Sequence, residues 1–202
     1  MSTATGNPVI ELIAGHPALD LVNTLDWRFR QSGTEELLNT YGDLIRFAEE
    51  SKLLTPMQAR ELRRTTDETA GMRVLYACRE LREAIAEAVY AGFEGREPSL
   101  EAVRVLEQQF KAARGHRRLV WEESRVEWTL TGSDPALPLW LLALSAERLM
   151  TSDGMHKVRE CGNAECRWVF LDTSKNHTRR WCDMKICGNR MKARRFKAQR
   201  RA

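Results

Sequence analysis

Four cysteines near the end of the chain have the spacing of a metal site. They form two C-x4-C pairs separated by fifteen residues, Cys161 with Cys166 and Cys182 with Cys187. Two close pairs joined by a short arm can place four thiolate sulfurs around one ion at about 2.3 Å, as in a tetrahedral zinc site. Because four sulfurs leave no coordination position for water or substrate, the spacing predicts one structural zinc ion per chain and not a catalytic one.

The sequence alone leaves other uses of these cysteines open. Iron–sulfur clusters also take four cysteines, but neither spacing here matches the usual cluster motifs. Two disulfides would fit less well, because the four residues lie close together and the fifth cysteine, Cys78, stands alone. His177 is the one nearby residue that could replace a cysteine as ligand. Cys78 lies on an apolar helical stripe, which predicts a buried structural thiol.

The net formal charge of +4 conceals two segments of opposite charge. From Lys157 to Ala202 there are 14 Lys or Arg and 4 Asp or Glu, a formal charge of +10, whereas the preceding residues have 18 and 24, a formal charge of −6. The change in composition follows Asp153-Gly154, so we expect two domains, 1–154 and 155–202. A short basic segment of this kind indicates an anionic partner.

Nucleic acid is the partner that we predict for the basic segment. Lys and Arg supply point charges for phosphates and forked donors for guanine edges. The candidate contacts are Arg179, Arg180, Arg190, Lys192, Arg194, Arg195 and Lys197. Arg190 directly follows the last zinc loop and could brace that loop instead. The alternatives are a solvated charged face, and an adaptor whose basic part docks on an acidic protein, including the acidic domain of a second copy in a homo-oligomer.

Periodicity predicts a mainly helical first domain. Apolar residues recur at three- and four-residue intervals from Gly71 to Tyr90, which indicates a long helix. Pro98-Ser99 and Asp134-Pro135 are signals for two further helices. Residues 118–130 alternate in two short runs, which predicts a hairpin between those helices. The fold class that we expect is therefore α+β, with a mainly helical N-terminal domain and one small hairpin.

The basic segment should form a small zinc module. We expect a strand at 167–171, a polar turn, a return strand at 179–181 and a basic helix after Cys187. A hairpin and a helix around one zinc ion make up a zinc-ribbon or treble-clef-like module.

Other classes of protein lack support in the sequence. It has no Walker loop, nucleophile elbow, HExxH motif or glycine-rich dinucleotide fingerprint, so we expect no enzymatic activity. It also has no long apolar run and no signal peptide, which predicts a cytoplasmic protein without membrane partners. His16, Asp20 and Asn23 are the one N-terminal polar group of note, and we expect them to make capping and turn hydrogen bonds.

Two segments resemble known families. RECGNAECRWVFLDTSKNHTRRWCDMKICGNRMKARRFK resembles the CGNR zinc finger, whose name corresponds to Cys187-Gly188-Asn189-Arg190. Further positions that match its pattern are Asp172, Ser174, Asn176, Arg180, Trp181, Cys182 and Met184. Upstream, HPALDLVNTLDWR at 16–28 and the segment 43–54 resemble the ABATE domain.

These resemblances together cover nearly the whole chain. They imply a stress-induced transcription regulator with a mainly helical N-terminal domain and one structural zinc ion, and they favour DNA over RNA as its partner. The alternative functions are the protein-interaction adaptor and a regulator that senses a small ligand through its N-terminal domain.

Overall fold

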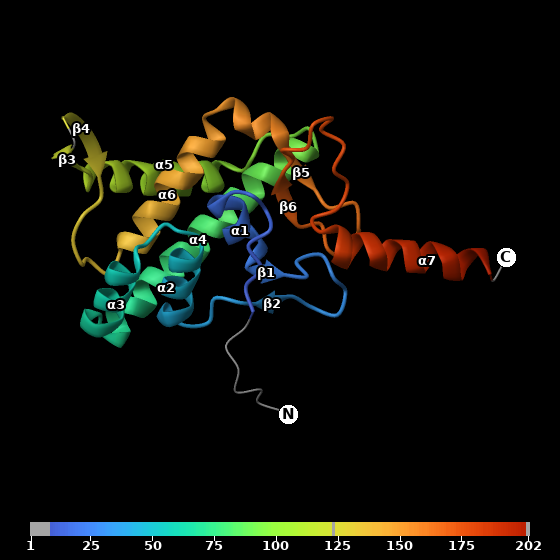
Figure 1. Cartoon of the computed structure of the whole chain (residues 1–202), viewed down its shortest axis with the longest axis horizontal. Helices are drawn as coiled ribbons and strands as arrows, with labels where there is room; N and C mark the ends of the chain where they lie inside the picture. The colour runs from blue at the N-terminus through green and yellow to red at the C-terminus, as the bar shows by residue number, and fades with distance from the viewer. Residues whose placement is uncertain (1–8, 123, 201–202) are drawn as a thin grey trace.

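The computed structural model describes residues 9–122 and 124–200, and Figure 1 shows a helical body from which one helix projects. The α-helices are α1 (Pro17–Asn23), α2 (Tyr41–Glu50), α3 (Pro56–Thr65), α4 (Glu68–Phe93), α5 (Leu100–Gly115), α6 (Leu137–Met150) and α7 (Asn189–Gln199). Two short helices, η1 (Asp153–Lys157) and η2 (Met184–Gly188), belong to the last quarter of the chain. The longest helix, α4, lies in the middle of the body and packs against α1, α2, α5 and α6.

Local sequence explains where these helices begin. Thr40 and Asp43 form a capping box at the start of α2, and Thr55 and Gln58 form another at the start of α3. Ser99 caps α5 by accepting a hydrogen bond from the backbone N–H of residue 102. Caps of this kind satisfy N–H groups that have no partner within the helix. The apolar stripe of α4 is buried as its periodicity predicts.

Three antiparallel pairs of strands complete the fold. They are β1 (Leu25–Asp26) with β2 (Glu35–Glu36), β3 (Arg118–Glu122) with β4 (Arg125–Thr129), and β5 (Val158–Glu160) with β6 (Val169–Leu171). The β3–β4 pair is the hairpin that the sequence predicts. The α+β class, with a mainly helical body and a small zinc module, is confirmed.

One strand prediction in the zinc module is wrong. Residues 179–181 were expected to return beside the 167–171 strand, but they form no strand. Instead β6 pairs along one edge with β5, and the side chain of Asn23 occupies its other edge. Residues 179–181 are held in place by isolated hydrogen bonds and not by a strand ladder. One of them joins the Gly162 N–H to the carbonyl oxygen of Arg180 at 2.9 Å.

A shared hydrophobic core joins the zinc module to the helical body. Val169 and Phe170 are fully buried in the same cluster as Leu19 of α1 and Leu142 of α6. The predicted domain boundary at residue 154 falls within η1, and both sides of it contribute to this cluster. Within the described residues, no helix has the length and apolar character needed to cross a membrane.

Candidate metal centre

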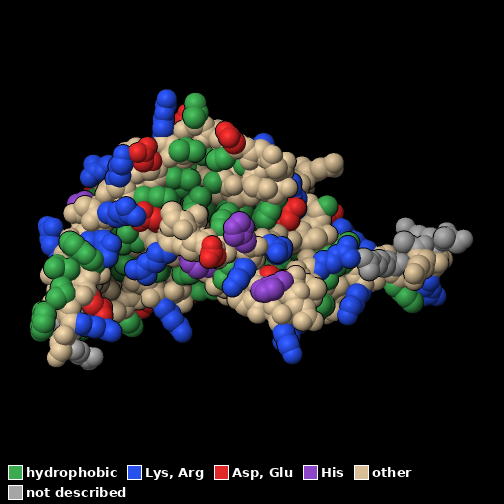
Figure 2. All heavy atoms as spheres, turned by 90° about the horizontal axis from the view of Figure 1, so that it is seen from above, with side chains coloured by type: hydrophobic (Ala, Val, Ile, Leu, Met, Phe, Trp, Pro, Cys, Tyr) green, Lys and Arg blue, Asp and Glu red, His purple; other side chains and the backbone are tan. Residues whose placement is uncertain are grey.

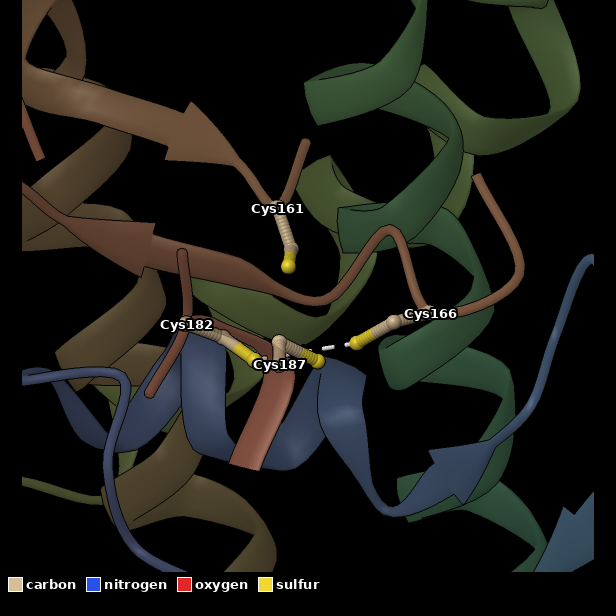
Figure 3. Close-up of side chains that lie close together, drawn as sticks. All are labelled: Cys161, Cys166, Cys182 and Cys187. Atoms are coloured by element: carbon tan, nitrogen blue, oxygen red, sulfur yellow. Dashed lines mark hydrogen bonds between the residues drawn. The ribbon is translucent and has the colours of Figure 1, made fainter. Parts of the chain in front are cut away.

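The four cysteines of the two C-x4-C pairs converge on one point. Their Sγ atoms all lie within 4.8 Å of one another, and all four residues are buried. Figure 3 shows the side chains of Cys161, Cys166, Cys182 and Cys187 directed toward a common centre. The Cys166 and Cys182 Sγ atoms are 3.7 Å apart, close to the about 3.8 Å edge of a tetrahedron whose Zn–S distances are about 2.3 Å. Donor type, number and spacing therefore fit a structural zinc ion.

Short loops and the η2 helix position these ligands. Cys161 directly follows β5, and its N–H donates to the carbonyl oxygen of Trp168 at 2.8 Å. Cys166 ends a turn in which its N–H donates to the carbonyl oxygen of Asn163 at 2.9 Å. Cys187 lies in η2, whose first turn is capped by the carboxylate of Asp183. The site is thus fixed by backbone hydrogen bonds from both sides of the module.

Buried polar contacts support the sulfur cluster. The Asn163 side chain has no exposed surface, and its Nδ2 lies 3.7 Å from the Cys187 Sγ, where it can donate to a thiolate. Hydrogen bonds from the neighbouring thiols, with that of Cys166 having the largest effect, hold the pKa of Cys161 well below its usual value.

The position of Gly188 in the CGNR segment leaves no room for a side chain. A Cβ there would lie 2.4 Å from the Met184 Sδ and 3.3 Å from the Trp181 ring, so glycine fits this position.

Asp172 organises the turn between the two cysteine pairs. One of its carboxylate oxygens accepts hydrogen bonds from the Ser174 N–H and Oγ at 2.9 and 2.6 Å, and the other accepts from the Arg179 N–H at 3.0 Å. The hydrogen bond from the Ser174 side chain lowers the pKa of Asp172. His177 Nδ1 lies 3.1 Å from the backbone oxygen of Asp172, so this histidine takes part in the turn and not in the sulfur cluster.

A second set of hydrogen bonds docks the zinc module on the helical body. The carboxamide of Asn23 donates to the carbonyl oxygen of Val169 and accepts from its N–H, both at 3.0 Å. The Trp168 Nε1 donates to the Asp26 carboxylate at 2.7 Å. Burial raises the pKa of Asp26, against the effect of the hydrogen bonds that it accepts. The module is therefore held at a fixed place on α1 and β1.

The polar residues of the HPALDLVNT segment have structural roles. His16 caps α1 by accepting from the N–H of residue 18, and Asp20 accepts from the Ala14 N–H at 2.8 Å. Capping and turn hydrogen bonds were expected here, but the long-range contact of Asn23 was not. No local pattern indicates this contact, because the two partners are 146 residues apart.

Arg190 links the start of α7 to the body. Its guanidinium lies 5.1 Å from the ring centre of Trp27, and Arg30 lies 4.7 Å from the same ring. Trp27 itself has a φ of 54°, which is uncommon for a residue with a Cβ. Beside it, a cleft of about 320 Å³ is lined by Glu35, Arg190 and Cys187 among others. Arg190 thus braces the zinc module against Trp27, directly after β1.

The predicted nucleic-acid contacts fall into two groups. Arg179 is half-buried, and its guanidinium donates to the carbonyl oxygens of Trp181 and Cys182 and lies over the Phe170 ring. With Arg190, it belongs to the scaffold of the site.

Exposed cations form the other group. Arg180 is exposed beside the Trp181 ring, and Arg194 forms an exposed ion pair with Glu165 at 2.7 Å. Lys192 and Lys197 are exposed on α7. The side chain of Arg195 lies outside the described part of the structure.

The fold and the sulfur cluster define a zinc-finger protein with a mainly helical N-terminal domain. Comparison with known families gives the same arrangement. Residues 157–200 match the CGNR zinc finger, and residues 15–153 match the ABATE family, described as "Putative stress-induced transcription regulator". The chain belongs to the ABATE family, with one structural zinc site in its C-terminal CGNR finger. No curated protein matches the chain.

Proposed function

We propose that the zinc finger and α7 bind DNA, and that the protein regulates transcription without catalysing a reaction. The observation that carries this proposal is α7 itself. It extends away from the body in Figure 1 and, of the described helices and strands, packs mainly against η2. Figure 2 shows Lys and Arg side chains along this projecting end.

An isolated helix of this length needs a partner to be stable. α7 has 11 residues, and helices shorter than about 12–15 residues are marginal in water without tertiary packing. Its cationic side chains repel one another when unpaired, and they are neutralised along a phosphate backbone. The major groove of DNA admits an α-helix, which supports duplex DNA as the partner. The description of the family as transcription regulators supports the same choice.

The zinc site has a positioning role in this proposal. It holds η2, and η2 leads directly into α7, while Arg190 on Trp27 fixes the first turn. The direction in which α7 leaves the body is therefore set by the zinc site and the body together. Zinc-binding thiols need a reducing compartment, which supports the cytoplasm as the place of action.

Fluorescence anisotropy with a short random-sequence DNA duplex tests the proposal. The full chain should bind at low salt, and a chain ending at residue 191, which keeps the bracing Arg190, should lose most of this binding while it keeps its zinc. An RNA duplex of the same length, measured in parallel, should bind more weakly. If neither nucleic acid binds the full chain, the proposal fails and the adaptor alternative replaces it.

A further inference from the structure

The β3–β4 hairpin presents an apolar face to solvent. Leu119 pairs with Trp128 and Trp121 with Val126 in its register, so these four side chains share one face. Their exposed fractions are 56, 57, 72 and 47%, respectively. Figure 2 shows hydrophobic side chains gathered at this end of the molecule, opposite α7. Two tryptophans exposed to this degree on one small surface are typical of an interaction site.

The hairpin also lacks support from the rest of the described chain. Its two strands pack on each other, and no other described helix or strand packs extensively on them. A single two-stranded hairpin is at best marginally stable in water, because one sheet face cannot be buried. A surface that covers this face would therefore stabilise the hairpin as well as bind it.

Charge argues for a protein as the covering partner. Residues 117–127 contain three arginines and three glutamates, so the segment has no net charge. Nucleic acids and anionic membranes attract positive segments, and this one has no excess of positive charge to offer them. On the apolar face itself, the guanidinium of Arg117 lies 5.3 Å from the ring centre of Trp128. The partner surface should thus be apolar with a carboxylate at its rim.

The body of the same protein has such a surface. A groove of about 580 Å³ lies between α4 and α5, and Ala84, Ala102 and Val105 line its apolar part. Glu80 and Glu101 stand on its rim, and neither makes an ion pair within the described residues. Next to it, Leu100 and Val103 on α5 are 77 and 43% exposed.

The placement of hairpin and groove suits a two-fold axis. The groove lies at the first turns of α5 and the hairpin follows its last turn, so the two lie near opposite ends of a helix of 16 residues, which is about 24 Å long. If two copies pack with their α5 helices antiparallel, the hairpin of each copy lies beside the first turns of the other copy's α5, where the groove is. A contact of this kind is self-complementary and closes as a dimer.

We propose that the protein forms a two-fold dimer in which the apolar face of each β3–β4 hairpin docks in the α4–α5 groove of the other copy. Trp128 enters the apolar groove, and Arg117 pairs with the Glu101 carboxylate. The same contact covers Leu100 and Val103. This proposal does not depend on nucleic-acid binding.

Sedimentation equilibrium of the zinc-loaded full chain tests for the dimer. Wild-type protein should dimerise in the micromolar range, and Trp128→Ala should weaken dimerisation by about thirtyfold, as for a buried aromatic anchor. Met57→Ala is the matched control, because Met57 is 80% exposed on α3, away from both surfaces. A monomer at all concentrations, or equal effects of the two substitutions, would overturn the proposal.

Charge reversal identifies which surface the hairpin occupies. Arg117→Glu and Glu101→Arg should each weaken the dimer by about tenfold, and the double variant should recover wild-type affinity because the pair is restored with its signs exchanged. Melting temperatures of all four proteins show whether each variant is folded. A dimer that is insensitive to Glu101→Arg, or a double variant no better than the single ones, would mean that the hairpin packs elsewhere, and the proposal would be wrong.

Discussion

The side chain of Asn23 acts as a strand partner for Val169. Its carboxamide donates to the carbonyl oxygen of Val169 and accepts from the N–H of the same residue, both at 3.0 Å. This is the pattern that a neighbouring strand would make along the free edge of β6. Because both residues are buried, water cannot replace these hydrogen bonds. Asn23 therefore ties the zinc finger to the helical body.

Asn23→Ala should lower the free energy of unfolding by roughly 2–4 kcal/mol, since it leaves the N–H and C=O of Val169 buried without partners. Urea unfolding followed by tryptophan fluorescence measures this change. Asn39→Ala is the control, because Asn39 is exposed and donates one hydrogen bond to the Glu36 carbonyl oxygen. If the two substitutions lower the stability equally, the strand-partner role of Asn23 is wrong.

Thiol reactivity should separate the metal ligands from Cys78. Burial raises the pKa of the Cys78 thiol to about 12, so its reactive thiolate is scarce at neutral pH. We expect the native zinc-loaded protein to react slowly with a thiol reagent at all five cysteines.

Chelation of the zinc should then expose the cysteines at 161, 166, 182 and 187, while Cys78 reacts only after denaturation. Mass spectrometry of the labelled peptides assigns each site. Rapid labelling of Cys78 in the folded protein would contradict its assignment as a core residue, and so would loss of zinc in Cys78→Ala.

Asp20 should make stability depend on pH. Burial raises its pKa to about 6 from the usual 3.8. The folded protein then binds the proton more tightly than the unfolded chain, so the stabilising contribution is full below about pH 4 and is lost as the pH rises to about 6.

Asp20→Asn removes this titration and can keep an acceptor for the Ala14 N–H. The variant should be more stable than wild type at pH 7 by roughly 1–3 kcal/mol, and the difference should shrink as the pH falls from 6 toward 4. Because zinc release at low pH affects both proteins, their difference isolates Asp20. A difference that stays constant with pH would contradict the raised pKa.

Local patterns were sufficient to predict most of the elements and the metal ligands. The stripe on α4, the capping residue Ser99, and the alternation around β3 and β4 all act within a few residues of the chain. The cysteine pairs could be assigned for the same reason, because four-residue gaps fix two sulfurs on each loop.

Contacts between distant residues could not be predicted in this way. The edge of β6 that was expected to pair with residues 179–181 is occupied by Asn23, and no local signal in either segment indicates it. Arg179 and Arg190 illustrate the same limit. Their positions in a basic segment do not indicate that their guanidinium groups lie on the rings of Phe170 and Trp27.

The salt dependence of DNA binding tests the central claim most directly. The logarithm of affinity should fall linearly with the logarithm of salt concentration, by about 0.9 per phosphate neutralised. Alanine at Lys192, Arg194 and Lys197 should flatten that slope by about 2–3 units, because each substitution removes one cation that pairs with a phosphate. Zinc content should remain unchanged, since none of the three is a ligand.

Alanine at three exposed arginines of the body, Arg60, Arg73 and Arg148, gives a control with the same change in net charge. Anisotropy titrations of one DNA duplex over a salt series compare the three proteins. The account predicts that the slope of the α7 variant is flatter and that the control keeps the wild-type slope. Equal slopes for the two variants would contradict the assignment of α7 as the DNA-binding element.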